Sequence, residues 1–309
     1  MTSSPRRLVL TQGDPEGVGP ELLCALAADS MLREGDRVVA SRDAVDRVAR
    51  EVTQPWARRG RECLEPLLVQ PPALGVAAFG QYEALRYGVD LILEDPSCAL
   101  VTAPIDKKVA QSEGLTTPGH TEYLAQRAGI DDFAMAMLGP SLRVVLATIH
   151  MPLSEVPNSL DELSILRAAR LLLRALVDDF GIAEPRLAVL GLNPHAGEGG
   201  LLGHEDEAVI RPAVARLAHE FPHAKVVGPL PADTAIPLHA RGQFDGVVAM
   251  YHDQGLAPFK LLHFDDGVNR TLGLPFVRTS PDHGTAKDIA YTGKVNPASM
   301  FAAVKMARG

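Results

Sequence analysis

The chain has 309 residues, of which 46% are hydrophobic and 22% are charged, and its formal net charge at pH 7 is −8. This composition is typical of a soluble globular protein with one large or two medium domains, and no apolar run reaches the roughly 18 residues that a membrane-spanning helix needs. The acidic balance argues against nonspecific nucleic-acid binding, and the 3 widely spaced cysteines indicate neither a disulfide framework nor a metal knot.

The N-terminal part of the chain alternates short apolar strands with helices. The first strand, 7–11, is too short for a signal peptide and runs into a glycine-rich turn at 12–20, so we expect a cytoplasmic protein. Such a turn allows close backbone approach to a ligand, and the alternative is an ordinary connection between a strand and a helix. The next predicted elements are a helix at 21–28, a strand at 36–40 and a helix at 43–51. The prolines within 53–78 indicate an irregular connection with one short strand.

The remainder of the chain continues this alternation. Helices are predicted at 79–94, 119–127, 159–180 and 205–221 and from about 298, and strands at 99–102, 142–148, 186–192, 225–227 and 246–251. Ser159 and Glu162 form a capping-box pattern at the start of one helix, and Gly181 is suited to end it. Strands that alternate with helices predict an α/β fold with a mainly parallel core.

Three histidines each follow a predicted strand directly: His150, His195 and His252. Ligands of open α/β sheets bind beyond the carboxyl ends of the strands, which parallel strands place at one edge, so these imidazoles can converge. Three imidazoles suit Zn²⁺ or a related transition ion better than Mg²⁺. A single histidine is more often structural, and it is the shared placement that favours a metal site. The other histidines, expected in loops or at the surface, are His204, His219, His223, His239 and His263.

The stretch 244–278 carries further polar residues suited to an anionic small molecule. We expect them on loops rich in glycine and proline after a buried strand. They are Asp253, Lys260, Asn269 and Arg278. A second candidate position is the start of the predicted helix at 119, where His120 or Thr121 faces a ligand or Thr121 only caps the helix.

Several long motifs occur in a fixed order along nearly the whole chain. They are GDPEGVGPE (13–21), TAPIDK (102–107), GHTEYLA (119–125), HMPL (150–153), GLNPHAGEGG (191–200), GPLPADT (228–234), AMYHDQG (249–255), GVNRTLGLPFVRTS (267–280) and DHGTA (282–286). In this order they resemble the 4-hydroxythreonine-4-phosphate dehydrogenase family of vitamin B6 biosynthesis. The resemblance implies oxidation of 4-phosphooxy-L-threonine to a β-keto acid, which decarboxylates to 3-amino-2-oxopropyl phosphate in pyridoxal 5′-phosphate biosynthesis.

The same resemblance implies roles for individual residues. A divalent metal (Zn, Co or Mg) would be held by His150, His195 and His252. Substrate contacts would come from His120, Thr121, Lys260, Asn269 and Arg278. Candidates for catalytic roles are Lys260, Asp233 and Asp253, with the general base left open between the two aspartates. The family is homodimeric with its metal site at the subunit interface, so we expect some of these residues to serve the partner's site.

Two segments also resemble the wider group of isocitrate and isopropylmalate dehydrogenases, namely the turn at 13–21 and the loop at 283–297. This implies cofactor contacts from Gly13, His283, Gly284, Thr285, Ala286, Asp288 and Asn296. An acid at Asp288 would accept hydrogen bonds from the adenosine ribose and repel a 2′-phosphate, so we predict NAD rather than NADP. Neighbouring Lys287 would soften that preference, and the alternative role of Asp288 is that of an acid at a helix N-terminus.

The resemblance also implies a two-lobed isocitrate/isopropylmalate dehydrogenase-like fold with a mainly parallel sheet core and an interlobe cleft. The first lobe, on the cofactor side, would take 1–114 and 278–309. The second lobe, 115–277, would carry the metal, the substrate and the dimer contacts.

Departures from the family pattern leave the substrate open. Asp106 stands where Asn is expected in many relatives, and Asp265 and Asp266 add negative charge beside a loop that should hold an anion. The alternative substrates are 4-phospho-D-threonate or 4-phospho-D-erythronate from sugar-acid breakdown, and a cyclic diol carboxylate. A different class of function is a non-catalytic metal- or ligand-binding homologue.

Overall fold

The computed structural model describes residues 5–69 and 79–309. The chain forms two compact units, the first comprising Met1–Asp131 with Leu274–Gly309 and the second Asp132–Gly273. The sequence predicts a lobe boundary at 115, whereas helix α6 (His120–Ala128) lies in the first unit. The reason is packing, because Tyr123 and Leu124 of α6 share an apolar core with the preceding helix α4 (Gln81–Glu94).

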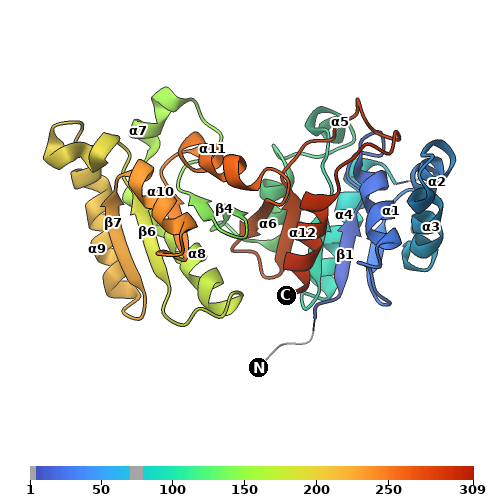
Figure 1. The fold of residues 1–309 in the computed structure, drawn as a ribbon, viewed down its shortest axis with the longest axis horizontal. Coiled ribbons are helices and arrows are strands. Elements are labelled where there is room, and N and C mark those ends of the chain that lie inside the picture. Colours follow the sequence, from blue (N-terminus) through green and yellow to red (C-terminus); the bar gives the residue numbers. More distant parts are fainter. Residues whose placement is uncertain (1–4, 70–78) are drawn as a thin grey trace. The chain divides into compact units, whose positions relative to one another are not determined.

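The first unit is built on a parallel sheet (Figure 1). Its strands lie in the order β2 (Arg37–Val39), β1 (Leu8–Thr11), β3 (Ala99–Thr102) and β10 (Val277–Pro281). Its other helices are α1 (Gly19–Ala28), α2 (Arg42–Glu51), α3 (Pro55–Leu64), the 3-10 helix η1 (Glu65–Leu67), α5 (Lys107–Ser112) and α12 (Ala298–Arg308). Val9 and Leu100 of the sheet pack against Leu85 and Ile92 of α4, so one face of the sheet is buried by that helix.

The second unit has a mixed sheet whose larger part is parallel (Figure 1). Its strands lie in the order β9 (Val268–Leu272), β4 (Ala134–Leu138), β5 (Arg143–Leu146), β8 (Gly246–Ala249), β6 (Arg186–Leu190) and β7 (Lys225–Leu230). Only the β9–β4 and β4–β5 pairings among these described strands are antiparallel. Its helices are η2 (Leu153–Glu155), α7 (Val156–Ser159), α8 (Glu162–Asp178), η3 (Pro194–Gly200), the π-helical turn η4 (Asp206–Ile210), α9 (Arg211–Glu220), α10 (Ala232–Ala240) and α11 (His252–His263).

Strand β8 shows how the two faces of this sheet are covered. A Cβ at Gly246 would meet Leu172 and Leu176 of α8, so this position faces α8. The next residue, Val247, belongs to the core that Phe259 of α11 completes. Successive strand residues point to opposite faces, so α8 and α11 cover opposite faces of the sheet, and β8 is buried on both.

The prediction of an α/β fold with a mainly parallel core is confirmed, and several local predictions are wrong. The segment predicted as irregular at 53–78 contains α3 and η1, while 70–78 lies outside the described residues. Pro55 occupies the first turn of α3, where a fixed φ and a missing N–H are compatible with a helix. Strand β4 and helices α5 and α10 were not predicted from the sequence.

The capping box predicted at Ser159 and Glu162 is also wrong. Ser159 ends the short helix α7, and the cap of α8 is Asp161. The backbone N–H of Ser164 donates to Asp161 Oδ1 (2.8 Å), and the Ser164 hydroxyl accepts from the backbone N–H of Asp161 (3.3 Å). Within the described residues, no helix combines the length and apolar character that crossing a membrane requires.

Candidate active site

The three candidate metal ligands follow three neighbouring parallel strands of the second unit. His150 comes after β5, His252 opens α11 after β8, and His195 lies in η3 after β6. The sheet order β5-β8-β6 makes β8 the direct neighbour of both other strands. The three histidines therefore belong to one edge of the sheet, the carboxyl edge at which ligands of α/β proteins bind.

His150 and His252 lie closest to one another in this set. Their ring centroids are 5.6 Å apart. Nδ1 of His252 is 2.7 Å from Oδ1 of Asp253, so this carboxylate orients the ring and leaves Nε2 for another partner. A cavity of about 590 Å³ borders the pair, with Pro152 and Tyr251 in its wall.

His195 is held in a separate loop with an unusual backbone. Residues 195–199 all have positive φ, including His195 (54°) and Glu198 (44°), a conformation that non-glycine residues rarely adopt. The buried carboxylate of Asp206 accepts hydrogen bonds from the backbone N–H of Leu192 (2.9 Å) and the side-chain amide of Asn193 (2.9 Å). Asp206 thus fixes the start of the loop that carries His195.

Gln254 links the turn that carries His252 to strand β6, which precedes His195. Its Nε2 donates to the carbonyl of Gly191 (2.7 Å), and its Oε1 accepts from the backbone N–H of Met250 (2.7 Å). The roles of Gln254 and Asp206 were not predicted from the sequence. Gln254 lies two residues after His252 in the motif at 249–255, so a polar residue near a candidate ligand was the available signal. Asp206 lies outside the motifs, 11 residues after His195, and only the fold brings it to Leu192 and Asn193.

The structure does not gather all three histidines around one point. Across 5–69 and 79–309, no group of three or more His, Cys, Asp or Glu side chains is arranged to hold a metal ion. Two of the three predicted ligands lie side by side and the third shares their edge of the sheet. The complete metal trio therefore stays a prediction.

The other candidates of the second unit lie on regular elements, so their expected placement on loops is wrong. Lys260 is on α11 and Asn269 is on β9. Leu256 and Phe259 bury one face of α11 against the sheet, which outweighs the glycine and proline that indicated a loop. Asn269 Oδ1 is buried and has no hydrogen-bond partner within the described chain, whereas Asp233 is exposed on α10.

Two histidines expected at the surface or in loops are instead buried on helices α10 and α11. His239 is 2% exposed and its Nε2 accepts from the backbone N–H of Arg143 (3.1 Å). Burial lowers the pKa of His239 below its ordinary value. His263 is 5% exposed and lies between the Ser141 hydroxyl (2.9 Å) and the Asp266 carboxylate (2.9 Å). Both are structural histidines of the second unit.

In the first unit, the buried guanidinium of Arg278 lies near the half-buried side chain of His120. Arg278 lies on β10, not on a loop as expected, and its Nη2 donates to the Thr102 hydroxyl (2.6 Å). Burial lowers the pKa of Arg278 to about 10, so the guanidinium remains charged at neutral pH. Burial, together with the charges of Arg278 and Lys107, lowers the pKa of His120 well below its ordinary value.

His120 is therefore neutral beside a permanent cation. It starts helix α6, followed by Thr121, where the backbone N–H groups of a helix N-terminus are available to an anion. Its Nε2 is buried and makes no hydrogen bond with a described residue. The region of His120, Thr121 and Arg278 is suited to an anionic group such as a carboxylate or phosphate.

The two segments predicted to bind the cofactor lie against each other. Gly13 has a φ of +67°, and a Cβ there would lie 2.1 Å from the carbonyl oxygen of Pro104, so the turn requires glycine. The backbone N–H of Val18 donates to the carbonyl of Thr285 (2.9 Å). The fold thus brings the 13–21 turn and the 283–286 loop into contact, while their role in cofactor binding stays a prediction.

The remaining cofactor candidates differ in their surroundings. Nε2 of His283 is buried and has no hydrogen-bond partner within the described residues, while its Nδ1 is 2.9 Å from the Gly284 carbonyl. Asp288 is exposed. Asn296 Oδ1 accepts from the backbone N–H of Ala298 (3.0 Å), which gives Asn296 a role in starting α12.

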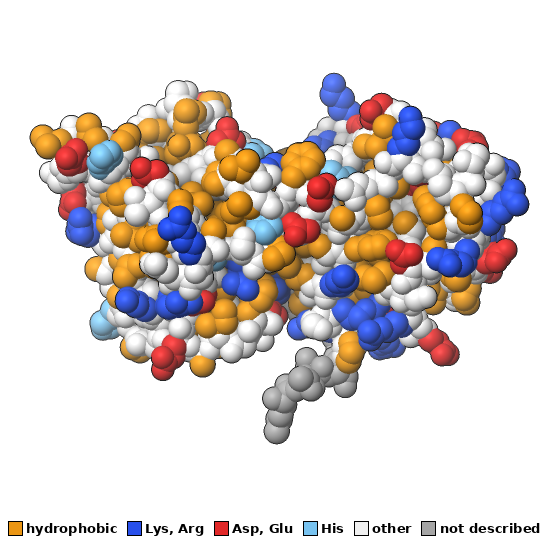
Figure 2. Space-filling view, in the orientation of Figure 1, with side chains coloured by type: hydrophobic (Ala, Val, Ile, Leu, Met, Phe, Trp, Pro, Cys, Tyr) orange, Lys and Arg blue, Asp and Glu red, His pale blue; other side chains and the backbone are white. Residues whose placement is uncertain are grey.

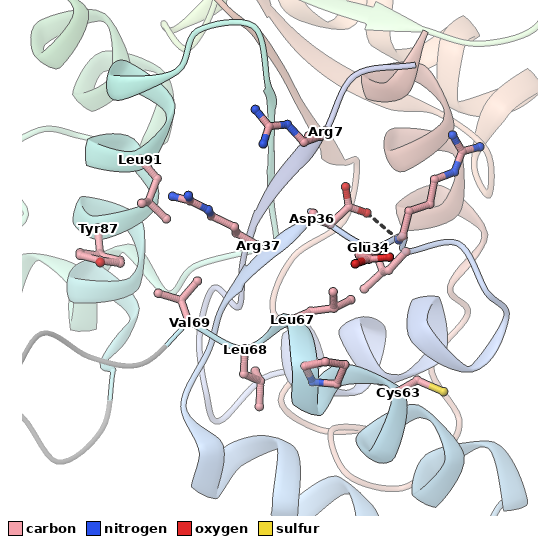
Figure 3. A pocket seen from close by; sticks show the side chains of 14 residues that line it. Arg7, Glu34, Asp36, Arg37, Cys63, Leu67, Leu68, Val69, Tyr87 and Leu91 are labelled. Atoms are coloured by element: carbon pink, nitrogen blue, oxygen red, sulfur yellow. Dashed lines mark hydrogen bonds between the residues drawn. The ribbon is translucent and has the colours of Figure 1, made fainter. Parts of the chain in front are cut away.

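A larger cavity lies away from all of these residues (Figure 3). It has a volume of about 900 Å³ and is lined by Arg7, Arg37, Tyr87 and Leu91 among others. Arg7 and Arg37 stand at the amino ends of β1 and β2, the edge opposite to the one where ligands of such sheets bind. None of the candidate residues lines it, so we assign it no part in the site.

Comparison with known proteins places these motifs in a family. The model of the pyridoxal phosphate biosynthetic protein PdxA matches residues 70–307. The chain is 42% identical to the 4-hydroxythreonine-4-phosphate dehydrogenase of Ruegeria sp. (strain TM1040), with 100% of this chain and 98% of the relative covered.

Solved structures show the same likeness. The crystal structure of 4-hydroxythreonine-4-phosphate dehydrogenase from Klebsiella pneumoniae is 35% identical, with a TM-score of 0.84 and coverage of 100% of this chain and 98% of that one. Isocitrate dehydrogenase from Methylococcus capsulatus is 14% identical, with a TM-score of 0.50 and coverage of 98% and 84%, and shares the fold alone. The predicted likeness to the isocitrate dehydrogenase fold is confirmed.

Proposed function

The chain belongs to the PdxA family of pyridoxal phosphate biosynthetic proteins, and on this premise we propose that it catalyses the metal-dependent, NAD-linked oxidation of 4-phosphooxy-L-threonine. The product is a β-keto acid that loses CO₂ to give 3-amino-2-oxopropyl phosphate for pyridoxal 5′-phosphate biosynthesis. The observation that carries this proposal is the position of His150, His195 and His252 at the carboxyl ends of three neighbouring parallel strands.

His150, His195 and His252 would hold the divalent metal. The chemistry of these donors fits a transition ion such as Zn²⁺, and the orienting carboxylate of Asp253 fits a metal-bound His252. When bound, the metal supplies a Lewis acid for the substrate's secondary alcohol. A site that is completed only in the dimer agrees with the absence of a gathered trio among the described residues of one chain.

Arg278 and His120 bind the anionic end of the substrate. The guanidinium offers several donors in a fixed plane, and neutral His120 adds a hydrogen bond without a second charge. Lys260 and Asn269 are proposed to offer the substrate a point charge and an amide, respectively. The Asp253 carboxylate keeps the imidazole ring of His252 oriented. The assignment of the general base between Asp233 and Asp253 stays open.

The turn at 13–21 and the loop at 283–288 bind the cofactor. Its nicotinamide, when bound, accepts the hydride. The residues present fit the adenosine end, because exposed Asp288 can accept hydrogen bonds from the ribose and the buried Nε2 of His283 has no other partner among the described residues. These residues hold the cofactor and contribute no group to the hydride step itself.

The protein forms a homodimer through the segments that carry the histidines. Each of these segments also exposes a large apolar side chain. Leu153 follows His150 and is 67% exposed, Leu201 follows the His195 loop and is 80% exposed, and Leu261 on α11 is 84% exposed. Figure 2 shows exposed hydrophobic side chains on the visible face of the second unit. We propose that these exposed leucines, each on a segment that carries a candidate ligand, belong to an interface in which a second copy covers the metal-binding edge.

The test is a comparison of substrates with the metal-loaded protein. NADH formation is followed at about 340 nm, the absorption band of the reduced nicotinamide, with 4-phosphooxy-L-threonine, 4-phospho-D-threonate, 4-phospho-D-erythronate and a cyclic diol carboxylate. A clear preference for the threonine phosphate is expected. A rate with only a sugar-acid phosphate or only the diol would support the NAD-linked oxidation but contradict a role in pyridoxal 5′-phosphate biosynthesis. Metal binding without NADH formation from any of them would indicate a non-catalytic homologue.

A further inference from the structure

The loop that follows β10 is fixed on the glycine-rich turn by buried backbone contacts. The carboxylate of Glu21 accepts hydrogen bonds from the backbone N–H groups of Tyr291 (2.7 Å) and Gly293 (2.8 Å). Glu21 is fully buried. A Cβ at Gly17 would lie 2.7 Å from the carbonyl oxygen of Thr285, so the close approach of the turn to the loop requires glycine at this position. The loop at 282–293 is therefore positioned by the turn at 13–21.

Lys287 adds a charged contact to this arrangement. Its Nζ lies 2.9 Å from Oδ2 of Asp14 and 2.7 Å from Oδ2 of Asp106. Asp14 is 3% exposed, and its other oxygen accepts from the backbone N–H of Glu16 (3.0 Å). The ammonium group of Lys287 thus points back to the turn and to the start of α5.

Asp106, which accepts a hydrogen bond from Lys287, is itself held in place by its contacts with the start of α5. Its Oδ1 accepts from the backbone N–H groups of Lys108 (3.0 Å) and Val109 (3.3 Å), which caps α5. Its second oxygen, Oδ2, faces Lys287. The hydrogen bond from Lys287 is the main reason that the pKa of Asp106 lies below its ordinary value. An asparagine here would preserve the cap and remove the charge, so the aspartate is what binds the lysine.

The next residue, Asp288, has different surroundings. It is exposed and forms no ion pair with any residue in the described part of the chain. The two adjacent charges are therefore separated, because Lys287 is paired within the fold while the carboxylate of Asp288 faces solvent. A ligand that meets the surface of this loop meets a negative charge first.

We propose that Lys287 is a positioning residue that ties the cofactor loop to Asp14 and Asp106, and that it is thereby withheld from the cofactor, leaving Asp288 to select NAD over NADP. This inference rests on the proposed function, in which the loop receives the adenosine end. A 2′-phosphate requires a cation to accept it, whereas a ribose 2′-hydroxyl requires an acceptor. Because Lys287 is paired with both Asp14 and Asp106, the group that the loop offers to the ribose 2′-hydroxyl is the Asp288 carboxylate.

The decisive variant is Lys287→Gln, with Lys294→Gln as its matched control. Lys294 is an exposed lysine a few residues along the same segment. The dissociation constants of NAD and NADP are measured by calorimetric titration of the full-length protein without substrate. Lys287→Gln is expected to weaken both nucleotides by about fivefold, the size of a surface ion-pair effect, and to leave the NADP-to-NAD ratio within about twofold. Lys294→Gln is expected to change neither constant.

Two further variants distinguish the positioning of the loop by Lys287 from direct recognition of the nucleotide by the loop. Asp106→Asn keeps the helix cap and is expected to weaken both nucleotides in parallel. Asp288→Asn is expected to shift the ratio about tenfold toward NADP, because it removes a charge close to the 2′-position. A selective loss of NADP affinity in Lys287→Gln would show that the lysine is a phosphate ligand and would overturn the proposal.

A second readout does not depend on nucleotide binding. Amide hydrogen exchange at 283–293 is expected to accelerate in Lys287→Gln and Asp106→Asn and to stay unchanged in Lys294→Gln. Unchanged exchange in Lys287→Gln and Asp106→Asn would show that the ion pairs of Lys287 do not fix the loop, even if the nucleotide affinities of these variants fell. If the unmodified chain binds neither nucleotide, the proposed function fails, while the exchange measurement still decides whether Lys287 fixes the loop.

Discussion

The surroundings of Arg278 are suited to the binding of an anion. It is buried beside neutral His120, and its charge persists because its pKa falls only to about 10. Replacing a guanidinium that binds substrate oxygens removes charged hydrogen bonds, which contribute about 1.5 to 3 kcal/mol each. The environment of Arg278 thus predicts a large effect on substrate use.

For Arg278→Gln we expect kcat/KM for 4-phosphooxy-L-threonine to fall by about 100-fold. Arg278→Lys should show a smaller fall in kcat/KM than Arg278→Gln, because lysine keeps the positive charge but lacks the planar guanidinium. Steady-state kinetics of both variants provide the measurement, with thermal unfolding as the control for folding. Equal kcat/KM values in Arg278→Gln and the unmodified chain would remove Arg278 from the substrate site.

Asp253 and Asp233 differ in what they contact. Asp253 lies 2.7 Å from the ring nitrogen of His252, whereas the Asp233 carboxylate contacts only the Thr234 hydroxyl (3.5 Å) in the described chain. We expect Asp253→Asn to weaken zinc binding by about 10- to 100-fold, because a carboxylate that orients a ligand histidine raises its basicity. Asp233→Asn should leave it unchanged. Competition with a chromophoric chelator measures both, and equal effects would argue against an orienting role.

The candidate residues themselves were accessible from the sequence because motif order and residue type carry that information. Their local surroundings were not. The lysine beside Asp288 was expected to weaken cofactor selection, and only the fold reveals its pairing with Asp14 and Asp106. Likewise, buried His239 accepts a hydrogen bond from the backbone N–H of Arg143, which is 96 residues away in the chain.

Helix α8 provides a direct comparison between a pattern and a structure. The serine at Ser159 and the glutamate at Glu162 match a capping box, but the helix begins after Asp161. An N-cap side chain contributes about 1 kcal/mol to the free energy of unfolding. Asp161→Ala is therefore expected to lower that free energy by about 1 kcal/mol in urea denaturation. Ser159→Ala should change it by less than about 0.5 kcal/mol, and the reverse order would restore the sequence interpretation.

Elements with strong periodicity were predictable and elements fixed by tertiary contacts were not. Strand β3 matches its predicted bounds of 99–102 because a buried run between polar residues specifies it. Strand β4 was missed, since its alanines and methionines carry little β-propensity and its pairing with β9 and β5 is what forms it. Helix α11 was missed because Gly255 and Pro258 obscure its apolar face.

The proposed homodimer would connect the exposed leucines to the metal site. If Leu261 lies in the interface, Leu261→Glu places a charge there and is expected to produce monomers in analytical ultracentrifugation. The same variant should lose zinc affinity, because the site is proposed to be completed by a second copy. Leu163→Glu is the control, since Leu163 is also exposed (64%) but lies on α8. A dimeric Leu261→Glu protein with full zinc affinity would contradict this interface.

Stability is expected to depend on pH through His239. Its pKa is lowered by burial in the native state, so the unfolded chain takes up a proton below about pH 6.5 that the native chain excludes. The contribution is present above that pH and is lost as the pH falls toward the native pKa. Urea midpoints between about pH 8 and pH 5 should therefore decline on acidification. His239→Gln should flatten this decline, and an unchanged slope would assign the effect to other groups.

We propose that this chain oxidises a phosphorylated hydroxy amino acid with a histidine-bound metal. The most direct measurement is the initial rate of NADH formation from 4-phosphooxy-L-threonine, taken before chelation, after chelation and after zinc is restored. We predict a rate that chelation abolishes and zinc recovers, and that His150→Ala, His195→Ala and His252→Ala each lose. A rate that survives chelation, or that persists in these variants, would contradict the proposed metal site.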